Sequence, residues 1–145
     1  MKRFTVALVV TLAVMATLDF VWLTTAMAGL YRPMMGDLLR PAPDMAAAVA
    51  FYLLYGVGVT ALVTVPVMSG SGRLRELAWK AGLFGLVAYA TYDLTGLSVI
   101  RGWSLPLSLI DMAWGVVITA LSALAAGLVV RALGLASTKG AYKDR

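Results

Sequence analysis

The chain has 145 residues, of which 61% are hydrophobic and only 13% are charged, and its formal net charge is +5. Soluble domains are about half apolar and about a quarter charged, so this composition is typical of a protein that lies in lipid. Cysteine and histidine are absent, which excludes disulfides, thiol chemistry, the usual zinc sites and imidazole acid–base catalysis. A nucleic-acid partner is not expected, because the cations do not form a basic face with interleaved aromatic residues.

Four apolar stretches are long enough to cross a bilayer, which takes about 20 residues of helix. They cover about residues 4–30, 45–68, 78–100 and 104–133. We therefore predict an all-α membrane protein with a single transmembrane domain over residues 1–145. Its four transmembrane helices form an up-down-up-down bundle.

The connections between these stretches are short. Residues 31–44 contain three prolines and cannot form one continuous helix, although a short interfacial turn fits at 34–39. The Ser-Gly-Ser-Gly sequence at 69–72 indicates a flexible turn, and residues 101–103 form a tight link. Residues 138–145 are expected to be a polar tail.

The lysines and arginines indicate the orientation, because they are enriched on the cytoplasmic side of membrane proteins. An even number of spans places nine of the twelve on one side, against Arg32, Arg40 and Arg101 on the other. We expect both termini in the cytoplasm of a bacterial inner-membrane, multi-pass protein. The nine are Lys2, Arg3, Arg73, Arg75, Lys80, Arg131, Lys139, Lys143 and Arg145.

The first stretch also fits a cleaved signal peptide. Lys2 and Arg3 precede an apolar run, and Ala26-Met27-Ala28 has the small residues of a cleavage site. Cleavage there would leave three helices and would remove Asp19. The choice between the two readings stays open at this point.

Three aspartates, Asp19, Asp93 and Asp111, lie inside three different apolar stretches. A carboxylate in hydrocarbon costs roughly 3 kcal/mol on insertion scales, so such a residue normally faces a polar interior. With a rise of about 1.5 Å per residue, each of the three lies roughly 10 Å below the outer edge of the bilayer. We therefore predict that they meet in one layer.

Small and polar residues recur at spacings of three and four along each stretch, which places them on one helix face. Such faces pack against neighbouring helices in membranes, so they bring aromatic side chains to the aspartate layer. The sequence Asp-x-x-Trp occurs twice, at residues 19–22 and 111–114, by inverted duplication or by coincidence. The aromatic residues expected at the layer are Trp22, Tyr52, Tyr55, Tyr89, Tyr92 and Trp114.

Several motifs resemble a bacterial family of predicted integral membrane proteins, known as domain of unknown function 2177. The resemblance covers about residues 4–134 and implies a four-helix inner-membrane protein, without an established activity. Gly96 stands where an asparagine is expected in that family, so one polar group of the layer is missing. The motifs are Leu18-Asp19-Phe20-Val21-Trp22-Leu23, Phe51-Tyr52 with Tyr55, Thr91-Tyr92-Asp93-Leu94-Thr95, and Asp111-Met112-Ala113-Trp114-Gly115.

Three ionised carboxylates in one layer would repel one another, so the layer must hold protons, hold a cation or pair with arginine, for which Arg101 is on the correct side. The first hypothesis is an outward-facing pocket that binds a small cationic ligand, with proton-coupled transport. A chain of this size would need a homodimer for a translocation path. No cofactor is expected.

Two alternatives remain. The protein is a membrane enzyme that acts on a lipid or another apolar substrate through carboxylate acid–base chemistry, or through a metal held by Asp19, Asp93 and Asp111. Otherwise the aspartates only fix the helix register in a structural or accessory subunit. The sequence does not decide whether the protein is an enzyme.

Overall fold

The computed structural model describes residues 1–137, and the elements in that range are helical. The predicted tail at 138–145, with three of the cations used for the orientation, lies outside the described residues. Consecutive elements join into four long helical segments. The elements are α1 (Lys2–Ala26), η1 (Met27–Tyr31), α2 (Arg32–Met35), η2 (Gly36–Leu38), α3 (Met45–Val59), η3 (Thr60–Thr64), α4 (Val65–Ser69), α5 (Leu74–Val99) and α6 (Leu105–Ala132).

Two π-helical turns, η1 and η3, carry the first and second segments past a proline. In each, the residue after the turn donates its N–H to a carbonyl five residues earlier, and Pro33 or Pro66 follows directly. Proline has no N–H, and its ring crowds the carbonyl four residues before it. The wider π turn relieves this crowding. Pro33 therefore does not end the first segment, which continues to Leu38, eight residues beyond the predicted end.

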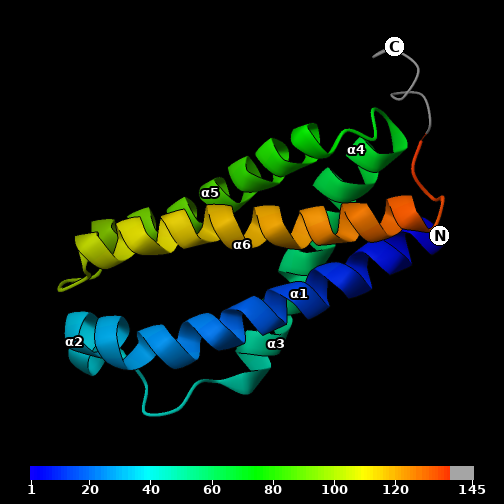
Figure 1. The fold of residues 1–145 in the computed structure, drawn as a ribbon. Coiled ribbons are helices and arrows are strands. Elements are labelled where there is room, and N and C mark those ends of the chain that lie inside the picture. Colours follow the sequence, from blue (N-terminus) through cyan, green and yellow to red (C-terminus); the bar gives the residue numbers. More distant parts are fainter. Residues whose placement is uncertain (138–145) are drawn as a thin grey trace.

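The four segments are arranged around α6 (Figure 1). α5 packs along α6 over the most extensive interface, and α1 packs along the other side of α6. The α3–η3–α4 segment is steeply inclined to the other three. Its first part contacts α1, whereas η3 contacts α1, α5 and α6.

Glycines permit the close approach of α5 and α6. A Cβ atom on Gly85 would collide with the backbone carbonyl of Gly115, and one on Gly115 would collide with the ring of Tyr89. Gly102, with a φ of 85°, makes the tight turn that joins the two helices, since positive φ values favour glycine. The predicted inward orientation of the small and polar faces is confirmed, because Gly82, Gly85, Asp93 and Gly96 on α5, and Ser108, Gly115, Thr119 and Ser122 on α6, are buried.

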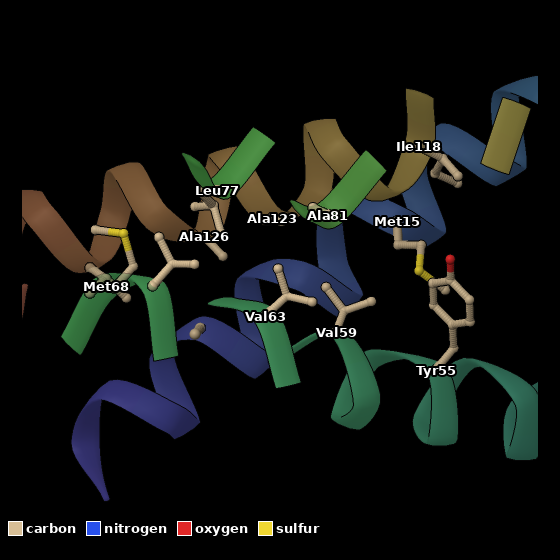
Figure 2. Packing of buried hydrophobic residues seen from close by; sticks show 13 residues of the cluster. Met15, Tyr55, Val59, Val63, Met68, Leu77, Ala81, Ile118, Ala123 and Ala126 are labelled. Atoms are coloured by element: carbon tan, nitrogen blue, oxygen red, sulfur yellow. The ribbon is translucent and has the colours of Figure 1, made fainter. Parts of the chain in front are cut away.

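The distribution of side chains suits a lipid surround. The buried polar side chains belong to Thr11, Asp19, Thr60, Thr64, Asp93, Ser108, Thr119 and Ser122, while large apolar side chains such as Leu54 (77% exposed) and Phe20 (70% exposed) point outward. Exposed apolar surface on this scale marks a membrane or protein contact. Figure 2 shows the apolar part of the interior, where Val59 and Val63 point from the inclined segment towards Ala81 and Ala123.

Three of the four segments in residues 1–137 are long and apolar enough to cross a membrane: Lys2–Leu38, Met45–Ser69 and Leu105–Ala132. The remaining predicted span, residues 78–100, corresponds to α5, which has 26 residues. Charged residues near its start, together with Tyr89, Tyr92 and Asp93, make it less apolar than the others. Length and composition therefore support three of the four predicted spans and do not confirm the one at α5.

The two ends of the described chain lie at one end of the molecule (Figure 1). The Arg3 guanidinium donates hydrogen bonds to the Leu135 carbonyl and to the Ser69 hydroxyl, and the Ser137 N–H donates to the Met68 carbonyl at 2.8 Å. The N-terminus, the α4–α5 link and the chain after α6 are thus held together. The opposite end carries α2 and the α5–α6 link.

Candidate functional site: a cavity with two carboxylates and aromatic walls

A cavity of about 450 Å³ lies among α1, η1, α3, α5 and α6. The steeply inclined α3 supplies four of the residues that line it. Two of the three aspartates line it, together with all six of the aromatic residues expected at the aspartate layer. The lining residues are Asp19, Trp22, Leu23, Tyr31, Ala48, Phe51, Tyr52, Tyr55, Ala88, Tyr89, Tyr92, Asp111 and Trp114.

Asp19, on α1, is held by two side chains from neighbouring helices. The Tyr52 hydroxyl of α3 donates to its Oδ2 at 2.8 Å, and the Trp114 Nε1 of α6 donates to its Oδ1 at 2.9 Å. The aspartate is only 7% exposed. These bonds explain why α1, α3 and α6 meet at this level, since each carboxylate oxygen has a neutral donor from a different helix.

Asp111, on α6, has a related environment. The Tyr31 hydroxyl donates to its Oδ1 at 2.5 Å and accepts a bond of 3.1 Å from the Trp22 Nε1. The indoles of Trp22 and Trp114 stack with ring centroids 4.6 Å apart and an interplanar angle of 12°. The two carboxylates are therefore linked by one pair of stacked indoles.

The two Asp-x-x-Trp sequences are joined by hydrogen bonds across the α1–α6 contact. Trp114, from the second copy, bonds to Asp19 of the first, and Trp22, from the first copy, reaches Asp111 of the second through Tyr31. The two segments run in opposite directions, so each tryptophan lies one turn from its own aspartate and beside the other. The sequence pattern has a structural reason in this reciprocal pairing.

Asp93 lies outside the cavity lining. It is 3% exposed on the face of α5 that packs against α6, where Ser108 and Trp103 interact with its carboxyl group. Its buried Oδ2 atom has no hydrogen-bond partner among the described residues. Asp111 is close enough to interact with it electrostatically. The structure thus brings Asp19 and Asp111 into one cavity and places Asp93 behind its wall.

The Trp103 side chain closes the Asp93 environment from the α5–α6 link. Its Nε1 donates to the Ser108 hydroxyl at 3.0 Å, and its ring lies over Gly96, where a Cβ atom would be 2.6 Å from the indole. The ring also meets Tyr92 edge-on, at a centroid distance of 5.3 Å. Tyr92 lines the cavity, so the Asp93 environment and the cavity share a wall.

The cavity lining, all of it within the described chain, contains no lysine or arginine. Arg101, which the sequence placed on the correct side to pair with the aspartates, is exposed in the α5–α6 link and does not line the cavity. The donors to Asp19 and Asp111 are neutral hydroxyl and indole groups. They orient the two carboxyl groups without bringing a positive charge to them.

A metal held by the three aspartates is not supported. Among residues 1–137, no group of three or more carboxylates comes close enough to hold a metal ion. The reason is the position of Asp93, which faces α6 from behind the wall that Tyr89 and Tyr92 form. The described residues therefore offer the metal variant of the enzyme hypothesis no site of three carboxylates.

Sequence reasoning missed two features of the site. Tyr31, the donor to Asp111, was assigned to the connection after the first span, because the helix was expected to end near residue 30. The π turn before Pro33 keeps Tyr31 helical and turns it into the cavity. Phe51 stands in a motif already noted, Phe51-Tyr52, and its place beside Tyr52 was the signal for a second aromatic wall residue.

A bundle of apolar helices with polar groups inside and large apolar side chains outside defines a helical integral membrane protein. Residues 4–128 match the family model described as Predicted membrane protein (DUF2177). Since the match covers most of the chain, the protein belongs to this family, as its motifs indicated. No curated protein and no solved structure matches the chain.

Proposed function

We propose that this protein binds a small organic cation in the cavity between α1, α3, α5 and α6 and exchanges it for protons across a bacterial inner membrane. One observation carries the proposal. Asp19 and Asp111 share a single aromatic-walled cavity whose lining holds no cationic side chain. Aromatic faces attract organic cations, and the attraction grows when water is excluded.

The proposed topology has four spans in an up-down-up-down bundle of one domain, with both termini in the cytoplasm. The two ends of the described chain lie beside the α4–α5 link, and this end supports it because it holds most of the lysines and arginines of residues 1–137. In this topology α5 is the remaining span of the four. Its face with Asp93 is covered by α6, so this carboxyl group does not face lipid.

The proposed ligand is recognised by charge and by aromatic contact. Asp19 and Asp111 supply the charge, while Tyr89 and the stacked indoles supply flat walls. A cavity of about 450 Å³ accommodates a small organic cation rather than a bare metal ion. The cavity lies at the end of the bundle away from the chain termini, so in this topology it faces outward.

Asp93 is the proposed proton carrier. It is a buried carboxyl group on the face of α5 that packs against α6, and its Oδ2 atom has no hydrogen-bond partner among residues 1–137. Its electrostatic interaction with Asp111 couples that proton to the charge in the cavity. A translocation path through a chain of this size would be completed by a second copy, in a homodimer.

The first test is equilibrium dialysis of benzyltrimethylammonium against the purified protein in lipid nanodiscs. Neopentylbenzene, in which a carbon replaces the charged nitrogen, is the neutral comparison. We expect the cation to bind at least tenfold more tightly than the neutral compound. Asp19→Asn should weaken cation binding at least tenfold and leave the neutral compound unaffected. The asparagine oxygen still accepts one of the two hydrogen bonds, so the fold is retained.

Asp44→Asn is the matched control, because it removes one carboxylate outside the cavity and keeps the helix cap of α3. It should bind like the unaltered protein. Equal binding of the cation and its neutral counterpart would remove the basis of the proposal. For transport, a proton gradient should drive uptake of the cation into proteoliposomes, and Asp93→Asn should abolish the uptake while retaining binding.

A further inference from the structure

The walls of the cavity close at one level and open at another. Tyr55 of α3 meets Phe84 and Tyr89 of α5 edge-on, at centroid distances of 5.7 and 6.2 Å, and its hydroxyl bonds to Thr119 of α6 at 2.7 Å. This level forms the base of the cavity. Away from this level, α3 and α5 diverge in Figure 1, while α3 packs against α1.

The gap between α3 and α5 is lined by residues from both helices. Ala48 and Phe51 come from α3, and Ala88 and Tyr92 come from α5. Phe51 is 43% exposed and Tyr92 is 61% exposed, so these rings form the rim of the opening. The opening faces sideways, because it lies between two helices rather than at their ends.

The rim lies at hydrocarbon depth in the proposed topology. Phe51 is six residues from the start of α3, and Tyr92 is seven residues from the end of α5, which places both roughly 10 Å inside the ends of their helices. Their outward neighbours, Leu54 and Leu94, are 77% and 52% exposed. A ligand that passes this rim comes from the acyl chains rather than from water.

Polarity changes from the rim to the far wall. The rim consists of aromatic rings, whereas the carboxylates Asp19 and Asp111 are on α1 and α6, the helices that form the far wall. Asp19 is only 7% exposed. A molecule that enters with its charge first would place a cationic head against the carboxylates and leave an apolar tail between α3 and α5.

We infer that the ligand is a cationic amphiphile, with a quaternary or protonated amine head and a hydrocarbon tail, which enters from the bilayer between α3 and α5. The inference rests on the proposed cation site and names the class of molecule that this site takes. The walls explain the selectivity: the carboxylates require the charge, and the lateral opening accepts a tail longer than the cavity itself.

The test compares two probes with the same head, benzyltrimethylammonium and benzyldimethyldodecylammonium, on the protein in nanodiscs. Affinities refer to the probe concentration within the lipid, measured on protein-free nanodiscs. In Ala48→Phe, the new ring narrows the opening from α3. We expect it to weaken binding of the dodecyl probe at least tenfold more than it weakens binding of the short probe.

Ala47→Phe is the matched control, since Ala47 is the exposed neighbour of Ala48 and does not line the cavity. It should leave both affinities unchanged. If Ala48→Phe weakens both probes equally, or neither, the lateral entry of an amphiphile is wrong while the cation site stands. If the unaltered protein binds neither probe, the cation site itself is wrong.

A second measurement does not depend on Ala48→Phe folding correctly. In the variant Trp79→Phe/Trp103→Phe, the remaining indoles are the cavity pair Trp22 and Trp114. Lipids with brominated acyl chains should quench their fluorescence through the lateral opening, and saturating dodecyl probe should reduce this quenching at least twofold. Unchanged quenching with bound dodecyl probe would contradict the inference.

Discussion

The α5–α6 pair and the α3 helix use opposite packing solutions within one small bundle. α5 and α6 approach so closely that a single methyl group on Gly85 would meet the Gly115 backbone. α3 carries large aromatic side chains towards the interior and packs against α1. It meets α5 at Tyr55, and the two helices diverge from there in Figure 1. The comparison teaches how a small membrane protein makes a cavity: glycine contacts hold one pair of helices rigid, and aromatic side chains hold another helix at a distance.

The physical basis of the difference is the driving force for helix association in lipid. Burying apolar surface brings little there, because acyl chains are as apolar as leucine, so close packing and interhelical hydrogen bonds decide which helices join. α5 and α6 have the close packing. α3 packs closely on α1 at Gly56, where a Cβ atom would be 2.5 Å from Leu12, and it adds two side-chain hydrogen bonds, from Tyr52 to Asp19 and between Tyr55 and Thr119.

The largest effect on stability is expected at the close-packed pair. Gly85→Ala places a methyl group against the Gly115 carbonyl and the Thr119 hydroxyl, and backbone atoms cannot move aside easily. We expect a loss of about 1–3 kcal/mol in the free energy of unfolding, measured by titration with sodium dodecyl sulfate from mild detergent. Gly29→Ala, where nothing lies within 4 Å, should change it by less than about 0.5 kcal/mol. Equal costs at both glycines would argue against a rigid α5–α6 contact.

A smaller effect is expected at the Tyr55–Thr119 hydrogen bond, which joins α3 to α6. Thr119 donates to the Gly115 carbonyl at 2.6 Å, so Tyr55 is the donor in this pair, and Tyr55→Phe leaves no hydroxyl unpartnered. We expect a cost of about 1 kcal/mol, as for interhelical bonds in membranes. A double-mutant cycle with Thr119→Val, in the same titration, should show coupling. Additive effects of the two changes would mean that this bond does not hold α3.

An effect of about the same size is expected at the helix cap of α3. The Asp44 Oδ1 accepts hydrogen bonds from the N–H groups of Ala46 and Ala47, at 3.1 and 3.2 Å. Asp44→Ala should cost about 1 kcal/mol, because those N–H groups lose their acceptor, and Asp44→Asn should restore most of it. Thermal unfolding followed by circular dichroism would measure both. A cost that asparagine does not restore would assign the effect to charge rather than to capping.

The smallest effect is expected for the ion pair at the same helix start. The Arg40 Nη1 and Asp44 Oδ2 atoms are 3.5 Å apart, and the two side chains are 74% and 49% exposed. Exposed pairs of this kind contribute little, so Arg40→Ala should change the unfolding free energy by less than about 0.5 kcal/mol. The same thermal measurement compares it with Asp44→Ala. A loss as large as that of Asp44→Ala would show that the pair, and not the cap, anchors α3.

The sequence by itself determined which faces point inward. The spacing of glycines and hydroxyl residues predicted the buried faces of α5 and α6, and the low tolerance of lipid for charge predicted that Asp19 and Asp93 are buried. The family motifs predicted a membrane protein. These features follow from local periodicity and from the cost of placing charge in hydrocarbon. Both can be recognised within a single stretch of the chain.

Only the tertiary structure decided what each aspartate faces. Depth counts placed all three at one level, but they could not tell which side of a helix wall each carboxylate would occupy. The approach of Tyr31 to Asp111, and the packing of α5 on α6 that turns Asp93 away from the cavity, depend on contacts between distant segments. Periodicity reports the rotation of a helix about its own axis, whereas the cavity depends on how far apart and at what angle helices pack, and those quantities arise from side chains of several helices at once.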